Sequence, residues 1–169
     1  MKTPLSYQDF TLKARVADTL KIEKKLQALN ATFAGVDRQC DIYFKVEKGK
    51  LKWRQGTIEN LITHYERVEE NGLEKTIVYR YDLDPTPHQI AELIDNQRKI
   101  GAIEKERKIF YLGKVKIHLD TTPDDQTFIE LEAIDRTGTQ SSEELRKQCL
   151  EVKEKLGIEN GDLIKTGYF

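Results

Sequence analysis

Two glutamates, Glu130 and Glu132, stand at alternate positions in Phe128-Ile-Glu-Leu-Glu132, where apolar and polar residues alternate as in a β-strand. In a strand, residues i and i+2 lie on the same face, about 6.5–7 Å apart. Carboxylates so spaced can bind one or two Mg²⁺ or Mn²⁺ ions, which take oxygen ligands. The spacing is common on its own, so its meaning depends on what the strand faces.

Lysines and arginines also occupy alternate positions in strand-like stretches. Lys52 and Arg54 alternate with apolar residues, and Lys105 and Arg107 have the same spacing. Phosphate oxygens pair well with both side chains, and arginine can bind them through two parallel N–H donors. We therefore expect the basic pairs to bind a phosphate chain, while the glutamates hold its divalent cation.

Two further stretches carry polar groups on one face and apolar groups on the other. The polar faces hold Lys114, Lys116, His118 and Asp120 in one stretch, and Asp9, Thr11, Lys13 and Arg15 in the other. No serine or cysteine nucleophile stands at a recognisable spacing. His118 is interpreted as a wall residue or hydrogen-bond partner rather than a catalytic base.

The simplest explanation of any one such strand is a sheet whose charged face meets solvent. The repetition across several strands favours another arrangement, in which helices cover the apolar faces and the charged faces converge on one lumen. Desolvated charges need partners. Basic and acidic side chains would partly satisfy one another, and a phosphate chain with a divalent cation would satisfy the rest.

The elements that would build this lumen can be assigned from periodicity and turn residues. Gly49, Asn71-Gly72 and Gly113 indicate hairpins. Strands are expected over 7–16, 41–46, 51–54, 61–68, 75–83, 103–112, 114–120 and 127–134. The predicted fold class is α+β, an antiparallel β-barrel or tunnel of about eight strands with three helices packed outside.

The three helices are marked by their ends. The first is expected over 19–29 after the cap Asp18, and the second from Thr86-Pro87 to Gly101. The third follows Ser141, with a capping-box glutamate at 144, and stops at Gly157. Amphipathic helices need an apolar surface, and the outer face of a curved sheet provides one.

Composition narrows the function class. The 169 residues are 34% charged, yet the net charge is only -1, which argues against general binding to nucleic acid or membrane surfaces. Cys40 and Cys149 lack CxxC spacing and are interpreted as thiols rather than a disulfide. With no apolar leader and no long apolar run, the sequence predicts one cytoplasmic domain over 1–169.

The motifs together resemble the CYTH superfamily, the triphosphate tunnel metalloenzymes, and in particular its class IV adenylyl cyclase-like branch. The resemblance spans nearly the whole chain, and no single motif is specific. The matching segments are Asp41-Ile-Tyr-Phe44, Gly49-Lys-Leu-Lys-Trp-Arg54, Tyr65-Glu-Arg67, Lys75, Lys105-Glu-Arg107, Ile117-His-Leu-Asp120, Phe128-Ile-Glu-Leu-Glu132 and Tyr168.

The resemblance implies a role for each matching residue, with Mg²⁺ or Mn²⁺ as cofactor and a triphosphate-containing small molecule as partner. The implied phosphate-binding residues are Lys13, Lys52, Arg54, Arg67, Lys75, Lys105 and Arg107. The implied metal ligands are Glu130, Glu132, Asp120 and Asp9, and the implied catalytic residues are Lys13, Arg107, Glu130 and Glu132. The reaction would be phosphohydrolysis or cyclisation.

One departure from the family pattern leaves a second function open. The family's E-x-E-x-K strand reads Asp9-Phe-Thr-Leu-Lys13 here, so Thr11 lacks a carboxylate. Fewer anionic ligands weaken the binding of a hard cation. The alternative is a non-catalytic module that binds a nucleotide or polyphosphate. Processing of RNA 5′-triphosphate ends is a less attractive third hypothesis because of the near-neutral charge, and a homodimer is left open.

Overall fold

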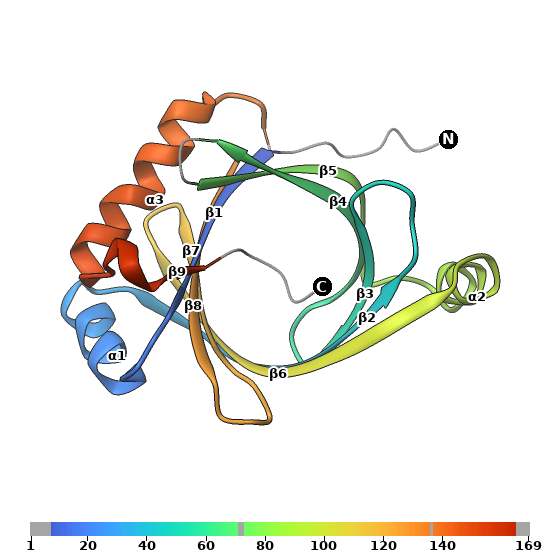
Figure 1. Ribbon diagram of the computed structural model, residues 1–169, viewed down its shortest axis with the longest axis horizontal. Helices are drawn as coiled ribbons and strands as arrows, with labels where there is room; N and C mark the ends of the chain where they lie inside the picture. Colours follow the sequence, from blue (N-terminus) through green and yellow to red (C-terminus); the bar gives the residue numbers. More distant parts are fainter. Residues whose placement is uncertain (1–7, 71–72, 136, 165–169) are drawn as a thin grey trace.

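The computed structural model describes residues 8–70, 73–135 and 137–164. Seen down its axis in Figure 1, the sheet forms a closed ring, with α1 and α3 against one side and α2 on the other. The described strands are β1 (Gln8–Arg15), β2 (Thr32–Phe44), β3 (Lys50–Gly56), β4 (Asn60–Glu70), β5 (Leu73–Leu83), β6 (Lys99–Leu112), β7 (Val115–Thr121), β8 (Thr127–Asp135) and β9 (Leu163–Ile164). The described helices are α1 (Thr19–Ala28), α2 (Pro87–Asn96), α3 (Ser142–Leu156) and a 3₁₀ turn (Asn160–Asp162).

All neighbouring strands of the barrel are antiparallel, in the order β5-β4-β3-β2-β6-β7-β8-β1. Pairing of β1 with β5, from Gln8↔Ile77 to Thr11↔Glu74, closes the ring. The short β9 adds to β1 beyond this pairing, at Lys13 and Ala14. Closure leaves few unpaired edge groups to satisfy. The predicted α+β antiparallel barrel with helices outside is confirmed.

The apolar faces of the strands point outward under the helices. Phe10, Ile117 and Leu131 belong to a buried cluster with Leu26 of α1 and Leu145 of α3. A second cluster joins Phe44, Leu51 and Ile62 to Leu93 of α2, with Trp53 half-buried beside it. Because side chains alternate along a strand, burying these faces outside directs the polar faces inward.

The helix termini follow the predicted chemistry. The Asp18 side chain accepts a hydrogen bond from the Lys21 amide, and Ser141 accepts one from the Glu144 amide. Gly157 ends α3 with a left-handed φ of 70°. No helix in the described part of the chain is both long and apolar enough to cross a bilayer.

Several predicted boundaries are wrong, and two differ from the structure by five residues or more. The second helix ends at Asn96 rather than Gly101, because Lys99 already pairs with Phe44 as the first residue of β6. β2 begins at Thr32, well before the predicted start at position 41. In its first half Phe33 and Val36 are exposed, and the alternation is interrupted by an irregularity in register between Phe33 and Gly35, so the sequence there shows no regular apolar face.

The turns and thiols agree with the sequence where the structure describes them. Gly49 and Gly113 lie between β2 and β3 and between β6 and β7. Both have positive φ, which favours glycine. The predicted Asn71-Gly72 turn lies outside the described residues. Cys40 and Cys149 are free thiols.

Candidate functional site

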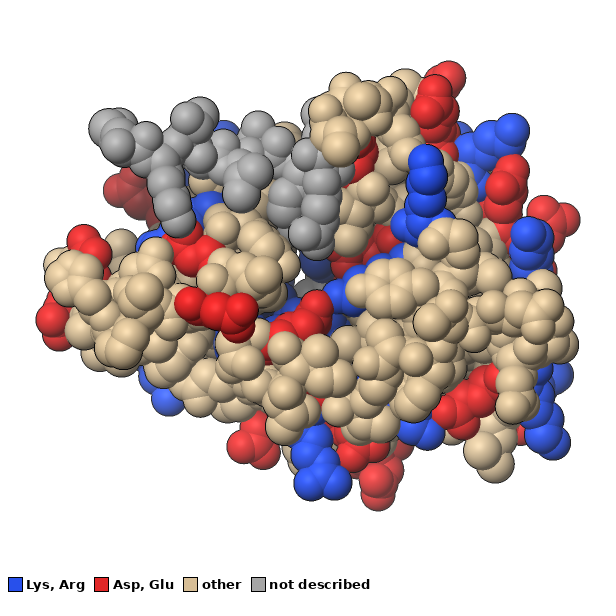
Figure 2. Space-filling view, turned by 180° about the vertical axis from the view of Figure 1, so that it is seen from behind, with Lys and Arg blue, Asp and Glu red and all other residues tan. Residues whose placement is uncertain are grey.

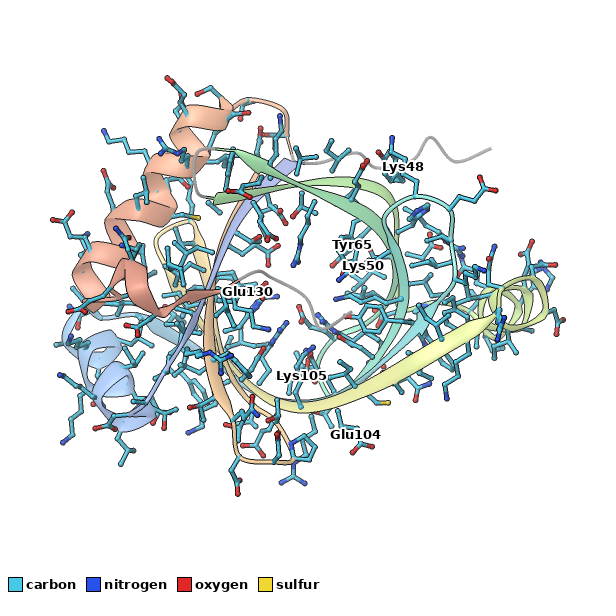
Figure 3. All side chains as sticks on the ribbon, in the orientation of Figure 1. Lys48, Lys50, Tyr65, Glu104, Lys105 and Glu130 are labelled. Atoms are coloured by element: carbon cyan, nitrogen blue, oxygen red, sulfur yellow. The ribbon has the colours of Figure 1, made fainter. Side chains whose placement is uncertain are left out.

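The inward faces of the barrel strands line one polar cavity. Figure 3 shows Lys105 and Glu130 pointing into the ring, while Glu104, the neighbour of Lys105 in the sequence, points away from it. In the space-filling view of Figure 2, a central hollow is bordered by basic and acidic side chains. The cavity has a volume of about 90 Å³, and its charged and imidazole lining residues are Asp9, Lys52, Arg54, Glu59, Arg67, Lys105, Arg107, Lys116, His118, Glu130 and Glu132.

Asp41 is the centre of the largest ion-pair group in the described part of the wall. Its two oxygens accept hydrogen bonds of 2.8 Å from Nε and Nη2 of Arg54. Lys105 Nζ lies 2.8 Å from the same carboxylate and Lys52 Nζ lies 3.7 Å away. Burial opposes ionisation of Asp41, but Arg54, Lys52 and Lys105 outweigh it and hold its pKa well below the usual value.

A second pair fixes Arg107. Its guanidinium donates hydrogen bonds of 2.7 and 2.8 Å to the two oxygens of Asp120, and both side chains are buried. A carboxylate bound in this bidentate way is poorly placed to bind a cation as well. Asp120 therefore orients Arg107, and its role as a metal ligand stays a prediction.

Glu130 and Glu132 project from β8 on either side of His118, which lies on β7. The distances are 3.9 Å from His118 Nδ1 to Glu130 Oε1 and 4.0 Å from His118 Nε2 to Glu132 Oε2. One ligand atom from each residue can be chosen so that all lie within 4.8 Å of one another. Burial opposes the ionised form of Glu130, but Arg67, Arg107 and Lys13 outweigh it and lower its pKa to about 2.

The imidazole of His118 is buried and neutral. Burial, followed by the positive charges of Arg107 and Lys116, holds its pKa well below the usual value. Within residues 8–70, 73–135 and 137–164, neither ring nitrogen has a hydrogen-bond partner. Carboxylates and a neutral imidazole are ordinary ligands of divalent cations, so the donor set fits the predicted metal.

The first strand brings three predicted residues to the same wall. Thr11 pairs with Glu132 and Lys13 pairs with Glu130 across β1 and β8. Burial lowers the pKa of Lys13, although Glu130 and Asp120 oppose that shift. Burial, and then the charge of Glu132, raises the pKa of Asp9 well above its usual value. Burial beside Glu132 thus favours the neutral form of Asp9.

The family model of the CYTH domain matches residues 10–168. The chain belongs to the CYTH family. A search of curated proteins finds no match. Among solved structures, the PH1012 protein of Pyrococcus horikoshii is 25% identical with a TM-score of 0.78, covering 95% of this chain and 96% of that chain.

Two other solved structures share the CYTH fold at lower identity. A provisionally assigned adenylate cyclase from Vibrio parahaemolyticus is 14% identical with a TM-score of 0.73, and 95% of this chain and 94% of that one are covered. HpAC1 from Hippeastrum, a provisionally assigned adenylyl cyclase described as having a dominant triphosphatase activity, is 13% identical with a TM-score of 0.60. It is matched over 95% of this chain and 92% of its own.

The CYTH tunnel does not include every predicted residue. Lys75 pairs with Phe10, whose side chain lies in the outer core, while the next residue, Thr76, lines the cavity. Because neighbouring side chains of a strand point to opposite faces, Lys75 lies on the outer face of β5. Its predicted place in the phosphate site is wrong by one residue of register. Tyr168 lies outside the described residues.

The tunnel also contains residues that were not predicted as site residues. Lys116 Nζ forms an ion pair with Glu59, whose pKa Lys116 and Arg54 lower to about 2 against the effect of burial. Glu59 lies in the loop between β3 and β4, where no periodicity marks it, and Asp37 accepts a hydrogen bond of 3.0 Å from its amide. Strand alternation with His118 was the available signal for Lys116.

One part of the tunnel wall is aromatic and apolar. Tyr43, Tyr65 and Tyr81 line the cavity together with Leu61 and Val78. The Tyr65 ring lies 5.3 Å from Lys52 Nζ and 5.1 Å from the Arg67 guanidinium carbon. Cations stacked on an aromatic face keep their charge in a place of low solvent exposure.

Proposed function

We propose that this CYTH protein is a metal-dependent enzyme that hydrolyses a triphosphate-containing small molecule bound in the tunnel. The observation that carries the proposal is that basic residues from several strands line the same cavity as Glu130 and Glu132. Among the residues that line the cavity, lysines and arginines outnumber carboxylates, while Asp41 and Asp120, buried in the wall, pair with Arg54, Lys105 and Arg107. Lining groups of mostly positive charge favour an anionic ligand in the cavity.

Two arginines are already oriented to receive a phosphate chain. Arg54 and Arg107 are held by Asp41 and Asp120, so little side-chain freedom is lost when they bind an anion. Lys52, Lys105 and Arg67 supply further donors from β3, β6 and β4. Fixed positive groups around the chain would neutralise its charge and stabilise the leaving phosphate oxygen.

The residues proposed to act most directly are Lys13, Arg107, Glu130 and Glu132. A divalent cation, when bound, would polarise a phosphoryl group of the ligand and activate a water molecule. Glu130 and Glu132 would hold that cation, with Asp9 as a neighbour of Glu132. Lys13, paired in register with Glu130, would place positive charge beside the reacting phosphate.

Hydrolysis is preferred to cyclisation within this proposal. The likeness to HpAC1 shows a shared fold, and the dominant triphosphatase activity described for that protein makes hydrolysis the first reaction to test. The second candidate is a binding module without turnover. The hydroxyl of Thr11, in place of a carboxylate, favours it, because it leaves one anionic ligand fewer for a second cation.

The proposed ligand is a small molecule of the cytoplasm rather than a nucleic acid. The near-neutral total charge provides no general attraction for RNA or DNA. The narrow cavity is also better matched to a phosphate chain than to a duplex.

Purified protein incubated with tripolyphosphate or ATP, each with Mg²⁺ and with Mn²⁺, tests the proposal. Phosphate release supports hydrolysis, cyclic AMP supports cyclisation, and binding without product supports the binding module.

Arg67→Ala is expected to weaken binding of either ligand at least tenfold. Lys75→Ala on the outer face of β5 is the matched control and is expected to bind as the unmodified protein does. Equal binding by the two variants, or no binding by the unmodified protein, would contradict the proposal.

A further inference from the structure

His118 is a buried polar side chain whose hydrogen-bonding capacity is unused. Only 2% of the residue is exposed, and both ring nitrogens lack a hydrogen-bond partner among the residues that the structure describes. Buried polar groups in folded proteins almost always have a partner, so two unsatisfied nitrogens on one ring require an explanation. The nearest acceptors are Glu130 and Glu132, at 3.9 and 4.0 Å. These distances are too long for hydrogen bonds.

The same distances suit three ligands around one ion. Metal–ligand bonds to nitrogen or oxygen are about 2.0–2.2 Å, so two ligands of one ion lie roughly 3–4 Å apart. His118, Glu130 and Glu132 each offer an atom within 4.8 Å of the other two. The arrangement is fixed by the backbone, because His118 is the register partner of Glu130 across β7 and β8.

The neighbours of this group decide whether a cation could lie between His118, Glu130 and Glu132. Lys116 is the register partner of Glu132, but its ammonium group pairs with Glu59. On the other side of Glu132 the register partner is Thr11, which offers a hydroxyl and no carboxylate. Arg67 lies 4.0 Å from Glu130, and the charges of Arg107 and Lys13 also act on it, so an incoming cation would have to share that carboxylate with them.

We propose that His118 is a metal ligand, supplying one ring nitrogen to a divalent cation that Glu130 and Glu132 also hold. This inference rests on the proposed function only for the presence of a cation in the tunnel. A mixed nitrogen and oxygen set discriminates among metals. Mg²⁺ prefers oxygen ligands alone, whereas imidazole suits transition metals, and affinity rises from Mn²⁺ to Co²⁺ along the Irving–Williams order. The tunnel should therefore bind Co²⁺ and Mn²⁺ more tightly than Mg²⁺.

Metal binding to the full chain, without any phosphate ligand, tests the inference. Calorimetric titration is expected to give at least tenfold tighter binding of Co²⁺ than of Mg²⁺. Pulsed electron paramagnetic resonance of bound Mn²⁺ is expected to show coupling to an imidazole ¹⁴N. The spectrum of the unmodified protein decides the question even if variants fold poorly. Bound Mn²⁺ without nitrogen coupling, or no binding of Mn²⁺ or Co²⁺ at millimolar concentrations, would overturn the proposal.

Variants assign the coupling to one histidine. His118→Gln is expected to abolish the ¹⁴N coupling and to weaken Co²⁺ binding at least tenfold, with Mg²⁺ binding changed less than threefold. His88, whose side chain is 90% exposed on α2, provides the control His88→Gln, expected to match the unmodified protein. Coupling that survives in His118→Gln would assign the ligand elsewhere and refute the inference.

Binding of tripolyphosphate in the presence of a chelator separates the two proposals. If tripolyphosphate binds the unmodified protein more tightly than Arg67→Ala but bound Mn²⁺ shows no nitrogen coupling, the His118 inference fails alone. If nitrogen-coupled Mn²⁺ is found but neither tripolyphosphate nor ATP binds, the proposed function fails and the metal site stands.

Discussion

Individual side chains of the tunnel are held by unequal numbers of partners. Asp41 forms ion pairs with Arg54, Lys105 and Lys52 at the same time. The Arg38–Glu106 pair, on the outer face of β2 and β6, is largely exposed to solvent. Removing one partner of a buried ion pair leaves uncompensated charge, which is far more costly than losing a screened surface pair. The two kinds of pair should therefore respond very differently to the same chemical change.

We expect Asp41→Asn to lower the free energy of unfolding by about 3–5 kcal/mol, because three cations would lose their shared counter-ion in a buried place. Glu106→Gln is the matched control and should change it by less than about 1 kcal/mol. Urea unfolding followed by circular dichroism measures both. Similar values for the two variants would show that the Asp41 group adds little to folding.

Lys105 gives the site a dependence on pH. Burial, and then Arg54 and Arg107, lower its pKa to about 8, although Asp41 and Asp120 favour the charged form. A phosphate ligand binds the protonated amine, so its affinity should fall as the pH rises through 8, by up to about tenfold per pH unit. Below that pH the dependence due to Lys105 should disappear.

Isothermal titration of tripolyphosphate from pH 7 to 10 measures this dependence. Lys105→Arg separates it from the ionisation of the ligand, because arginine keeps its charge over the whole range. The decline above pH 8 is expected to be weaker in this variant. An unchanged pH profile would mean that Lys105 does not lose its proton in the tunnel.

At the scale of the elements, α3 packs on the outer side of β1, β7 and β8, the strands that carry Lys13, His118 and Glu130. Leu145 and Leu156 are fully buried against the outer faces of the barrel, whereas Leu150 on the same helix is 37% exposed. Leu145→Ala is expected to cost about 2–5 kcal/mol of unfolding free energy, because it leaves a cavity in a closely packed core. Leu150→Ala should cost much less, and urea unfolding compares them. Equal losses would mean that α3 is not anchored through Leu145.

Sequence patterns predict these elements well wherever one strand face is apolar. In β7 the outward Val115, Ile117 and Leu119 are buried, so the inward phase of Lys116 and His118 could be read directly. Prediction from strand alternation fails where the outer face is exposed to solvent, as in the first half of β2. There the buried Asp37 and Gln39 could not be told from exposed polar residues.

The partners of the site residues were less predictable than the strands. Lys75 was assigned inward through its place in a motif, although a shift of one residue reverses the face of a strand. The Asp41 ion-pair group depends on cross-strand register between β2, β3 and β6, which no local pattern contains. Glu59 reaches the tunnel from a loop that Asp37 shapes through the amides of Ile58 and Glu59.

For the molecule as a whole, the polar lumen exists only in the folded state, because it forms when both apolar clusters pack on the outside of the closed barrel. Repulsion among the lumen cations is present only when the barrel is closed, since unfolding exposes them to water and salt. A ligand that neutralises them binds the folded protein and not the unfolded chain. Binding and folding are therefore linked by mass action.

This linkage predicts that tripolyphosphate raises the melting temperature of the protein. At a free ligand concentration of about 100 times Kd, the stabilisation is about 2.7 kcal/mol. For a chain of this length that corresponds to a Tm increase of about 5–10 °C, measurable by scanning calorimetry. Lys75→Ala should show the full shift, whereas Arg67→Ala at the same ligand concentration should show less than half of it. If sodium sulfate at equal ionic strength gave the same shift, the effect would come from anions at the surface and not from a ligand enclosed by the barrel.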